Sequence, residues 1–336
     1  MRRRVQWLLW NPTERRLRTP WRLLAGTVVL TLATITALVA LQTVGAAVGL
    51  TALLAGFASI TRSLAVSGFL GVVVALVLLG IAVTVDRRRP SDYGLRIDRE
   101  WLFDCGVGLL IGAGAMTAVV LVGVAGGWLV IEGVRVSAAG LSLLAGLLVV
   151  FLIVGIYEEL LIRGYLLTNL AEGFGWFEHI GPRSAAAVAT LVSSVAFGGF
   201  HAVNPNATLV STAVISVAGV MLALGYLFTG ELAIPIGIHI TWNVFQGLVY
   251  GLPVSGATLP VSVVDTTIRG PTVVSGGEFG PEAGLLGMGG IALAALGIAV
   301  YCRERDGTLA IDPAVTRPDL RNSPPIADQP VEQTGE

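Results

Sequence analysis

The stretch "LLVVFLIVGIYEELLIRGYLL", Leu147–Leu167, places two carboxylates and a guanidinium at the end of a long apolar run. The run begins near Ala138, and Glu158, Glu159 and Arg163 follow it. A charged side chain at the centre of a bilayer costs about 2.5–3.5 kcal/mol on insertion scales, and such charges usually face a bundle interior or a water-filled cavity. The stretch therefore predicts a membrane helix that carries part of a polar site.

The composition is that of a membrane protein with several spans. Of its 336 residues, 54% are hydrophobic and 13% are charged, and the mean hydropathy is +0.80. A soluble domain carries about 25% charged residues. The formal net charge is −1, which gives no reason to expect nucleic acid as a partner. Cys105 and Cys302 have no CxxC neighbour, so neither a thiolate metal site nor a disulfide framework is expected.

Apolar runs long enough to cross a bilayer predict an all-α fold, a polytopic bundle of about eight transmembrane helices. The predicted spans are Leu23–Ala46, Leu64–Val85, Leu102–Ile131, Ala138–Ile162, Ser184–Phe200, Thr208–Thr229, Leu232–Tyr250 and Gly284–Cys302. Apolar residues continue after the first span, so the topology of residues 46–62 stays open between a loop and a re-entrant piece.

Arginine is distributed unevenly among the loops. The N-terminal arm, the loop after the second span and the segment after the last span are rich in Arg, whereas alternate loops carry single Arg residues. Since basic residues accumulate in cytoplasmic loops, both termini are expected in the cytoplasm. The chain then divides into a basic cytoplasmic arm (1–22), a transmembrane bundle (23–302) and a disordered cytoplasmic tail (303–336) of a multi-pass protein of the cell membrane.

The charged residues of the fourth span have distinct directions. This orientation puts Glu158 and Glu159 toward the cytoplasmic end of the span. Glu159 and Arg163 are four residues apart, so they share a helix face and can form an ion pair. Glu158 is rotated by about 100° from Glu159. It can therefore face a cavity while Glu159 pairs with Arg163.

Two other predicted spans carry polar residues that lipid does not favour. His201 ends the fifth span, and Phe197 lies on the same helix face. His239 lies within the seventh span, with Asn243 four residues later, so both side chains can point at one place. The fourth, fifth and seventh spans could then bring a carboxylate, two imidazoles and an amide together.

These residue types suit hydrolysis of an amide or an ester. Burial raises the pKa of a carboxyl toward values useful to a general base, as Glu158 would need. Glu158, His201 and His239 could hold a divalent metal with one position open for water. Alternatively, His and Asn donors could stabilise an oxyanion while Glu158 activates water directly. Structural readings also stand: an ion-pair cluster or proton relay for the charges, and interhelical hydrogen bonds or a helix cap for the rest.

Three short motifs in order resemble those of one family. Glu-Glu-x-x-x-Arg at 158–163, Phe-x-x-x-His at 197–201 and His-x-x-x-Asn at 239–243 are similar to the motifs of the CPBP family. Its members are the CAAX proteases and bacteriocin-processing enzymes, also called the Abi family of intramembrane metalloproteases. The resemblance covers residues 92–250.

The resemblance implies an eight-span bundle and an intramembrane endopeptidase. It implies Glu158 as the base that activates water, with Glu159 and Arg163 orienting it. His201, His239 and Asn243 would complete a metal site or an oxyanion hole. It leaves open whether Zn²⁺ is required, and it implies a peptide or protein substrate, with or without a lipid group, met in membrane lipid.

Two other functions remain as alternatives. In a proton-coupled carrier, Glu158 and the His residues would relay protons. A non-catalytic membrane scaffold or immunity protein would keep the fold and act by binding. Neither paired inverted repeats nor two correspondingly broken spans are evident, which disfavours a carrier.

Overall fold

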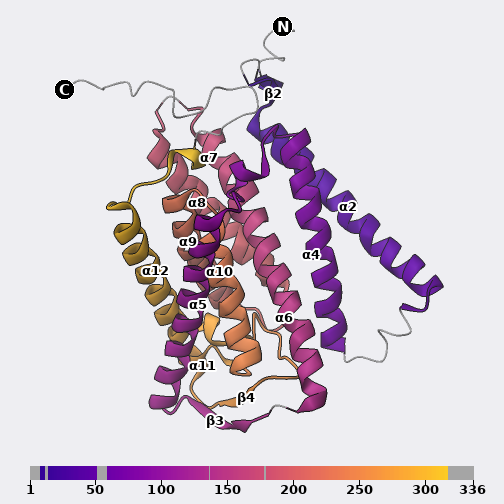
Figure 1. The fold of residues 1–336 in the computed structure, drawn as a ribbon, viewed down its shortest axis with the longest axis vertical. Helices are drawn as coiled ribbons and strands as arrows, with labels where there is room; N and C mark the ends of the chain where they lie inside the picture. The colour runs from indigo at the N-terminus through magenta and orange to yellow at the C-terminus, as the bar shows by residue number, and fades with distance from the viewer. Residues whose placement is uncertain (1–7, 12–13, 51–58, 136, 178, 317–336) are drawn as a thin grey trace.

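The computed structural model of the chain is a bundle of long helices with a small sheet at one end (Figure 1). It describes residues 8–11, 14–50, 59–135, 137–177 and 179–316. The long elements are α2 (Thr19–Ala47), α4 (Ser59–Thr84), α5 (Arg99–Ala125), α6 (Ala138–Glu159), the π-helix η2 (Leu160–Leu167), α7 (Thr168–Phe174), α8 (Pro182–Phe200), α9 (Leu209–Thr229), α10 (Ala233–Asn243), the π-helix η4 (Val244–Val249) and α12 (Leu285–Asp306). The short elements are β1 (Trp10–Asn11), β2 (Arg16–Leu17), η1 (Pro90–Tyr93), β3 (Leu129–Val134), η3 (His201–Val203), β4 (Val264–Ile268), α11 (Thr272–Ser275), η5 (Gly277–Phe279), η6 (Pro281–Ala283) and η7 (Pro313–Val315).

The predicted polytopic helical bundle is confirmed. Seven helices in the described ranges are long and apolar enough to cross a membrane. A shorter apolar helix, Ala233–Val249, occupies the place of the seventh predicted span. Large apolar side chains point outward along these helices, such as Leu110, which is 74% exposed, and Leu209, which is 90% exposed. That outer surface suits lipid rather than water, because soluble monomers rarely expose apolar patches of this extent.

The third predicted span was too long, and the fold is not helical throughout. The helix ends at Ala125 rather than Ile131, because Gly127 adopts a left-handed conformation (φ 70°) that stops it. The chain then enters β3, which pairs antiparallel with β4 in a two-stranded sheet. Of the open segment at 46–62, residues 51–58 lie outside the described residues, with α2 ending at Ala47 before them and α4 beginning at Ser59 after them. Of the predicted disordered tail, 317–336 lie outside them, but residues 303–316 do not fit that prediction: α12 continues to Asp306 and η7 buries Val315.

The fourth span also differs from its prediction. It does not end near Ile162, because α6, η2 and α7 form one continuous helix through Phe174. Arg163 is fully buried within it, and the Thr168 hydroxyl donates to the Arg163 carbonyl at 3.0 Å. The helix can continue through these polar residues because Arg163 and Thr168 both have hydrogen-bond partners inside the bundle. Glu158 consequently lies near the middle of this helix, whereas the sequence had placed it toward one end of a shorter span.

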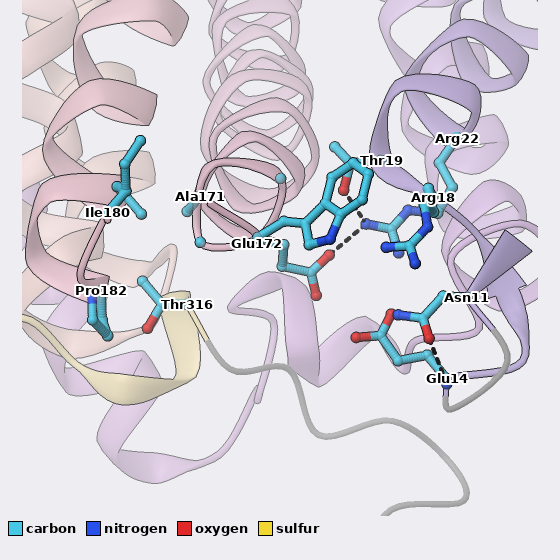
Figure 2. A pocket seen from close by; sticks show the side chains of 14 residues that line it. Asn11, Glu14, Arg18, Thr19, Arg22, Ala171, Glu172, Ile180, Pro182 and Thr316 are labelled. Carbon is cyan, nitrogen blue, oxygen red and sulfur yellow. Dashed lines mark hydrogen bonds and ion pairs between the residues drawn. The ribbon is translucent and has the colours of Figure 1, made fainter. Parts of the chain in front are cut away.

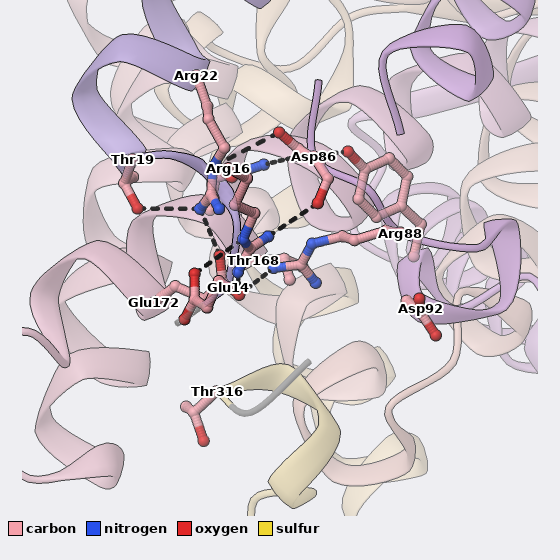
Figure 3. A network of polar contacts seen from close by, with 12 residues as sticks. Glu14, Arg16, Thr19, Arg22, Asp86, Arg88, Asp92, Thr168, Glu172 and Thr316 are labelled. Carbon is pink, nitrogen blue, oxygen red and sulfur yellow. Dashed lines mark hydrogen bonds and ion pairs between the residues drawn. The ribbon is translucent and has the colours of Figure 1, made fainter. Parts of the chain in front are cut away.

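Buried ion pairs tie the N-terminal segment to the bundle where α2 begins (Figure 3). Glu172 accepts from Arg16 at 2.8 Å and from Arg22 at 2.5 Å, and Arg88 lies 2.5 Å from it. Asp86 lies 3.6 Å from Arg22 and accepts from Asn169 and Tyr93. Three guanidiniums around one carboxylate compensate its burial. The cluster closes this end of the bundle.

The closest helix contact is between α5 and α10. A Cβ on Gly108 would meet the Ile234 carbonyl, and one on Gly112 would lie 2.5 Å from the Ile238 carbonyl oxygen. Small residues four apart let two helices approach closely in a membrane, as the spacing predicts. This contact holds α10, which carries His239, against the bundle.

We expect Gly112→Ala to destabilise the protein by about 1–3 kcal/mol, the usual cost of overpacking a tight core. The new methyl group would push α10 away from α5. Gly114→Ala is the matched control, because no atom outside its own helical neighbourhood lies within 4 Å of the added Cβ. Thermal unfolding in detergent measures both variants. Equal melting temperatures for the two would contradict the tight contact.

Candidate active site

The innermost part of the site is a chain of buried charges that links three helices. Glu159, fully buried on α6, accepts from Arg163 at 2.8 Å, as its spacing predicts. Arg163 also donates to the Gly219 carbonyl of α9 at 2.9 Å. The same Glu159 oxygen lies 2.7 Å from Nδ1 of His239 on α10. The Glu159 carboxylate therefore fixes the position of His239, while Arg163 balances its charge.

Glu158 faces a different direction, again as the helical rotation predicts. Its Oε2 lies 3.9 Å from His201 Nε2 and 3.7 Å from His239 Nε2. Its Oε1 accepts from the Tyr157 hydroxyl at 3.1 Å. Among the described residues, the buried Oε2 atom has no hydrogen-bond partner. The two distances exceed those of direct hydrogen bonds, so the three atoms surround a space without bonding to one another.

The hydrogen bonds of both imidazoles determine which ring nitrogen faces Glu158. His201 Nδ1 lies 2.8 Å from the Phe197 carbonyl oxygen, and His239 Nδ1 lies 2.7 Å from the Glu159 carboxylate. Carbonyl and carboxylate oxygens accept only, so each Nδ1 carries a hydrogen. In the neutral rings, each Nε2 then has a free lone pair directed toward Glu158. Two imidazole lone pairs and one carboxylate oxygen thus converge.

Phe197 joins the parts of the site. Its ring packs edge-on against His201, with centroids 4.7 Å apart, and against His239 at 6.0 Å. The Arg163 guanidinium lies 4.6 Å from the centroid of the same ring. These contacts restrict both imidazoles to one orientation and add a cation–π interaction to the buried charge. Phe197 thus packs against both imidazoles and the Arg163 guanidinium.

A cavity of about 460 Å³ surrounds these groups, within the usual range for ligand sites. Glu158, His201, His239 and Asn243 all line it, so four of the six expected site residues share one space. Glu159 and Arg163 lie behind its wall, fully buried. The remaining histidine, His179, is exposed in the turn before α8.

The sequence reasoning missed a second carboxylate in the cavity wall. Glu282, in η6, is buried and lines the cavity. Gln246 donates to it, and so does the Ser255 hydroxyl at 2.7 Å. Burial raises the pKa of the Glu282 carboxyl above its usual range, while these donors oppose the shift. Nothing in "GPEAG" distinguishes this residue from other loop glutamates, because its role depends on contacts with distant segments.

The donor set suits a divalent metal in its chemistry. His Nε2 atoms and a carboxylate are common zinc ligands, and each imidazole has its Nδ1 held by an acceptor, as in known metal sites. In the part of the chain that is described, however, no group of three or more His, Cys, Asp or Glu side chains is spaced to hold a metal ion. The space beside Glu158 Oε2 could hold either a water molecule or an ion.

Comparison with known families decides what kind of domain carries this site. Residues 140–245 match the profile of the Rce1-like family, described as type II CAAX prenyl endopeptidase Rce1-like. The chain carries an Rce1-like CAAX endopeptidase domain. The matched range contains all six residues expected in the site and lies within residues 92–250. No curated protein and no solved structure matched the chain.

The Rce1-like family is a peptidase family, so residues 140–245 carry a peptidase-family domain. The match also fits the seven candidate spans of a multi-pass membrane protein. Several parts of the site come from outside the Rce1-like match, among them the start of α4, Ser255 and Glu282. These parts form the outer wall of the cavity, and residues of the matched range form the rest of its lining.

Proposed function

We propose that this protein is a membrane-embedded endopeptidase that hydrolyses a peptide bond with water activated by Glu158. One observation carries the proposal: Glu158 Oε2, buried and without a hydrogen-bond partner, faces two imidazole Nε2 atoms at 3.7 and 3.9 Å. These acceptors suit a water molecule that can donate to them. The substrate is a peptide or protein segment, with or without a lipid group, that reaches the site in the membrane.

In the proposed reaction, Glu158 Oε2 takes one proton from water while an Nε2 holds the other by a hydrogen bond. The oxygen attacks the carbonyl carbon of the substrate. Asn243, which lines the same cavity, donates from its amide to the developing oxyanion, the kind of interaction that provides large transition-state stabilisation. The C–N bond then breaks, and Glu158 returns its proton to the leaving amine.

The inner residues have positioning roles in this proposal. Glu159 accepts the Nδ1 hydrogen of His239 and so keeps the Nε2 lone pair directed at the water site. The Phe197 carbonyl does the same for His201. If Zn²⁺ is required, Glu158, His201 and His239 would hold it, and it would lower the pKa of a bound water.

We also propose that the end where α2 begins and α12 ends faces the cytoplasm. Many arginines at described positions lie at this end: Arg15, Arg16, Arg18, Arg22, Arg87, Arg88, Arg89, Arg96, Arg99, Arg183, Arg303 and Arg305. The other end has Arg62, Arg135 and Arg269. Two of these, Arg135 and Arg269, are paired with Asp265 and Glu132. The excess of Arg in short loops favours this orientation.

A comparison of peptides tests the proposed activity without knowing the substrate. Membrane and released peptides are identified by mass spectrometry from cells that make wild-type protein or Glu158→Gln. We expect a set of fragments that disappears with Glu158→Gln and persists with Glu132→Gln, an exposed glutamate of β3 that does not line the cavity. Identical peptide sets from all three strains would argue against a protease.

A further inference from the structure

In the part of the chain that the structure describes, the cavity around Glu158 extends toward one end of the molecule. Its outer wall is formed by residues of the first turns of α4, the loop after α8 and the segment between η4 and α12: Ser63, Ser67, Asn204, Pro205, Val254, Ser255, Ala257 and Glu282. All of these segments lie at the end that carries β3 and β4 (Figure 1). His201 itself follows the last residue of α8, so Glu158 meets it where α8 ends.

The helices are packed closed toward the opposite end. Beyond Glu159, the continuous helix places Leu160, Arg163 and Leu167 in the bundle with no more than 1% of their surface exposed. Further along it, Thr168 and Tyr226 of α9 share a hydrogen bond of 2.8 Å. The Glu172 and Asp86 ion cluster follows (Figure 3).

A second cavity exists at the closed end, but it does not lead to the site. It measures about 380 Å³ and is lined by polar side chains that include Glu14, Arg18, Arg22 and Glu172 (Figure 2). None of its lining residues also lines the cavity around Glu158. A polypeptide at the Arg-rich face would therefore meet packed helices and a charged pocket, and not the catalytic groups.

We infer that the site takes its substrate from the side of the membrane opposite the cytoplasm. This inference rests on the proposed function and adds the substrate class: a peptide segment that has already been exported, or the non-cytoplasmic end of a membrane protein. The cavity opens at the Arg-poor end and is closed at the Arg-rich end, which the charge rule assigns to the cytoplasm. A cytoplasmic protein tail would approach the wrong face.

The side chains that line the cavity further restrict the class of peptide that can be the substrate. The helices that line it contribute apolar side chains, among them Phe151, Val154, Met221, Leu222 and Trp242, whereas the residues of its outer wall include serine and asparagine side chains. Apolar side chains beside the scissile bond would bury their surface against this apolar lining, which favours binding. The expected substrate is thus an extended segment with apolar residues next to the cleaved bond.

Cysteine labelling tests the side of access independently of activity. A membrane-impermeant maleimide is applied to intact cells that make Ala257→Cys, in the cavity mouth, or Thr308→Cys, exposed after α12. The wild-type chain, with its two free cysteines, gives the background. We expect Ala257→Cys to react in intact cells at the rate found after permeabilisation, and Thr308→Cys to react only after permeabilisation. The reverse pattern would overturn the inference.

The peptide comparison separates failure of this inference from failure of the proposed function. Fragments that depend on Glu158 should map to non-cytoplasmic or exported segments. If they map to cytoplasmic segments, the protein is a protease but the side of access is wrong. If no fragment depends on Glu158, the proposed function is wrong, and the inference about the substrate class is then wrong as well.

Discussion

Glu158→Gln is expected to reduce the cleavage rate about 10²–10⁴-fold, the usual contribution of a positioned general base. Glutamine has nearly the same shape, and its carbonyl can still accept from Tyr157, but it cannot take a proton from water. The folded protein should be as stable as the wild type or more so, because the change removes a buried carboxylate oxygen that lacks a partner. Loss of activity without loss of stability separates a catalytic role from a structural one.

The rate is measured with purified protein in lipid vesicles on a peptide found by the fragment comparison. Glu158→Asp provides a second test, because it keeps the charge but withdraws it by one methylene, a displacement that can itself cost 100-fold. Glu132→Gln is the control for a surface glutamate, since it loses only an exposed pair with Arg269 at 3.2 Å. Activity within a few-fold of wild type in Glu158→Gln would exclude Glu158 as the base.

Arg163→Met is expected to destabilise the protein by about 3–5 kcal/mol, the usual cost of breaking a buried ion pair from one side. Glu159 is fully buried, and of its two charged or polar neighbours in the described residues it would keep His239 alone. Total stabilities of domains are about 5–15 kcal/mol. The variant should therefore accumulate poorly and melt at a clearly lower temperature. Arg163→Lys should not restore it fully, because one ammonium cannot reproduce the planar donor geometry toward Glu159 and Gly219.

A double variant shows whether the cost comes from the unpaired charge. Glu159→Gln combined with Arg163→Met removes both charges and should recover much of the stability lost in Arg163→Met. It should still be impaired in cleavage, because His239 loses the carboxylate that fixes its ring. Arg135→Met is the surface control, and its exposed pair with Asp265 should contribute less than about 1 kcal/mol. If Arg163→Met melts like the wild type, the buried pair has no structural importance.

Much of the fold could be predicted because a bilayer restricts what a chain can do. The apolar runs predicted where the long helices lie, and the errors were in the predicted ends of several of them. The third ended early at a left-handed Gly127, and the fourth continued past Arg163. Hydropathy could not predict that the fourth helix continues past Arg163. A charged residue lowers the hydropathy of a segment in the same way whether the helix ends there or the charge is buried with partners, as Arg163 is with Glu159 and Gly219.

The site was predicted as far as helical spacing reaches. Spacing alone gave the Glu159–Arg163 pair and the separate direction of Glu158. The link from Glu159 to His239 depends on which helices are neighbours, and no single sequence contains that information. Glu282 was missed for the same reason. The position of the cavity also required three-dimensional contacts, because the sequence placed Glu158 toward one end of its helix and the structure places it near the middle.

The central claim is that Glu158, His201 and His239 hold the attacking water. Electron density for the cavity in crystals of the protein tests it most directly, with anomalous data at the zinc edge to distinguish a metal ion from water. We predict a water or an ion within about 3 Å of Glu158 Oε2 and of both Nε2 atoms. Density that places either imidazole with Nε2 turned away from Glu158, and nothing bound between them, would contradict the account.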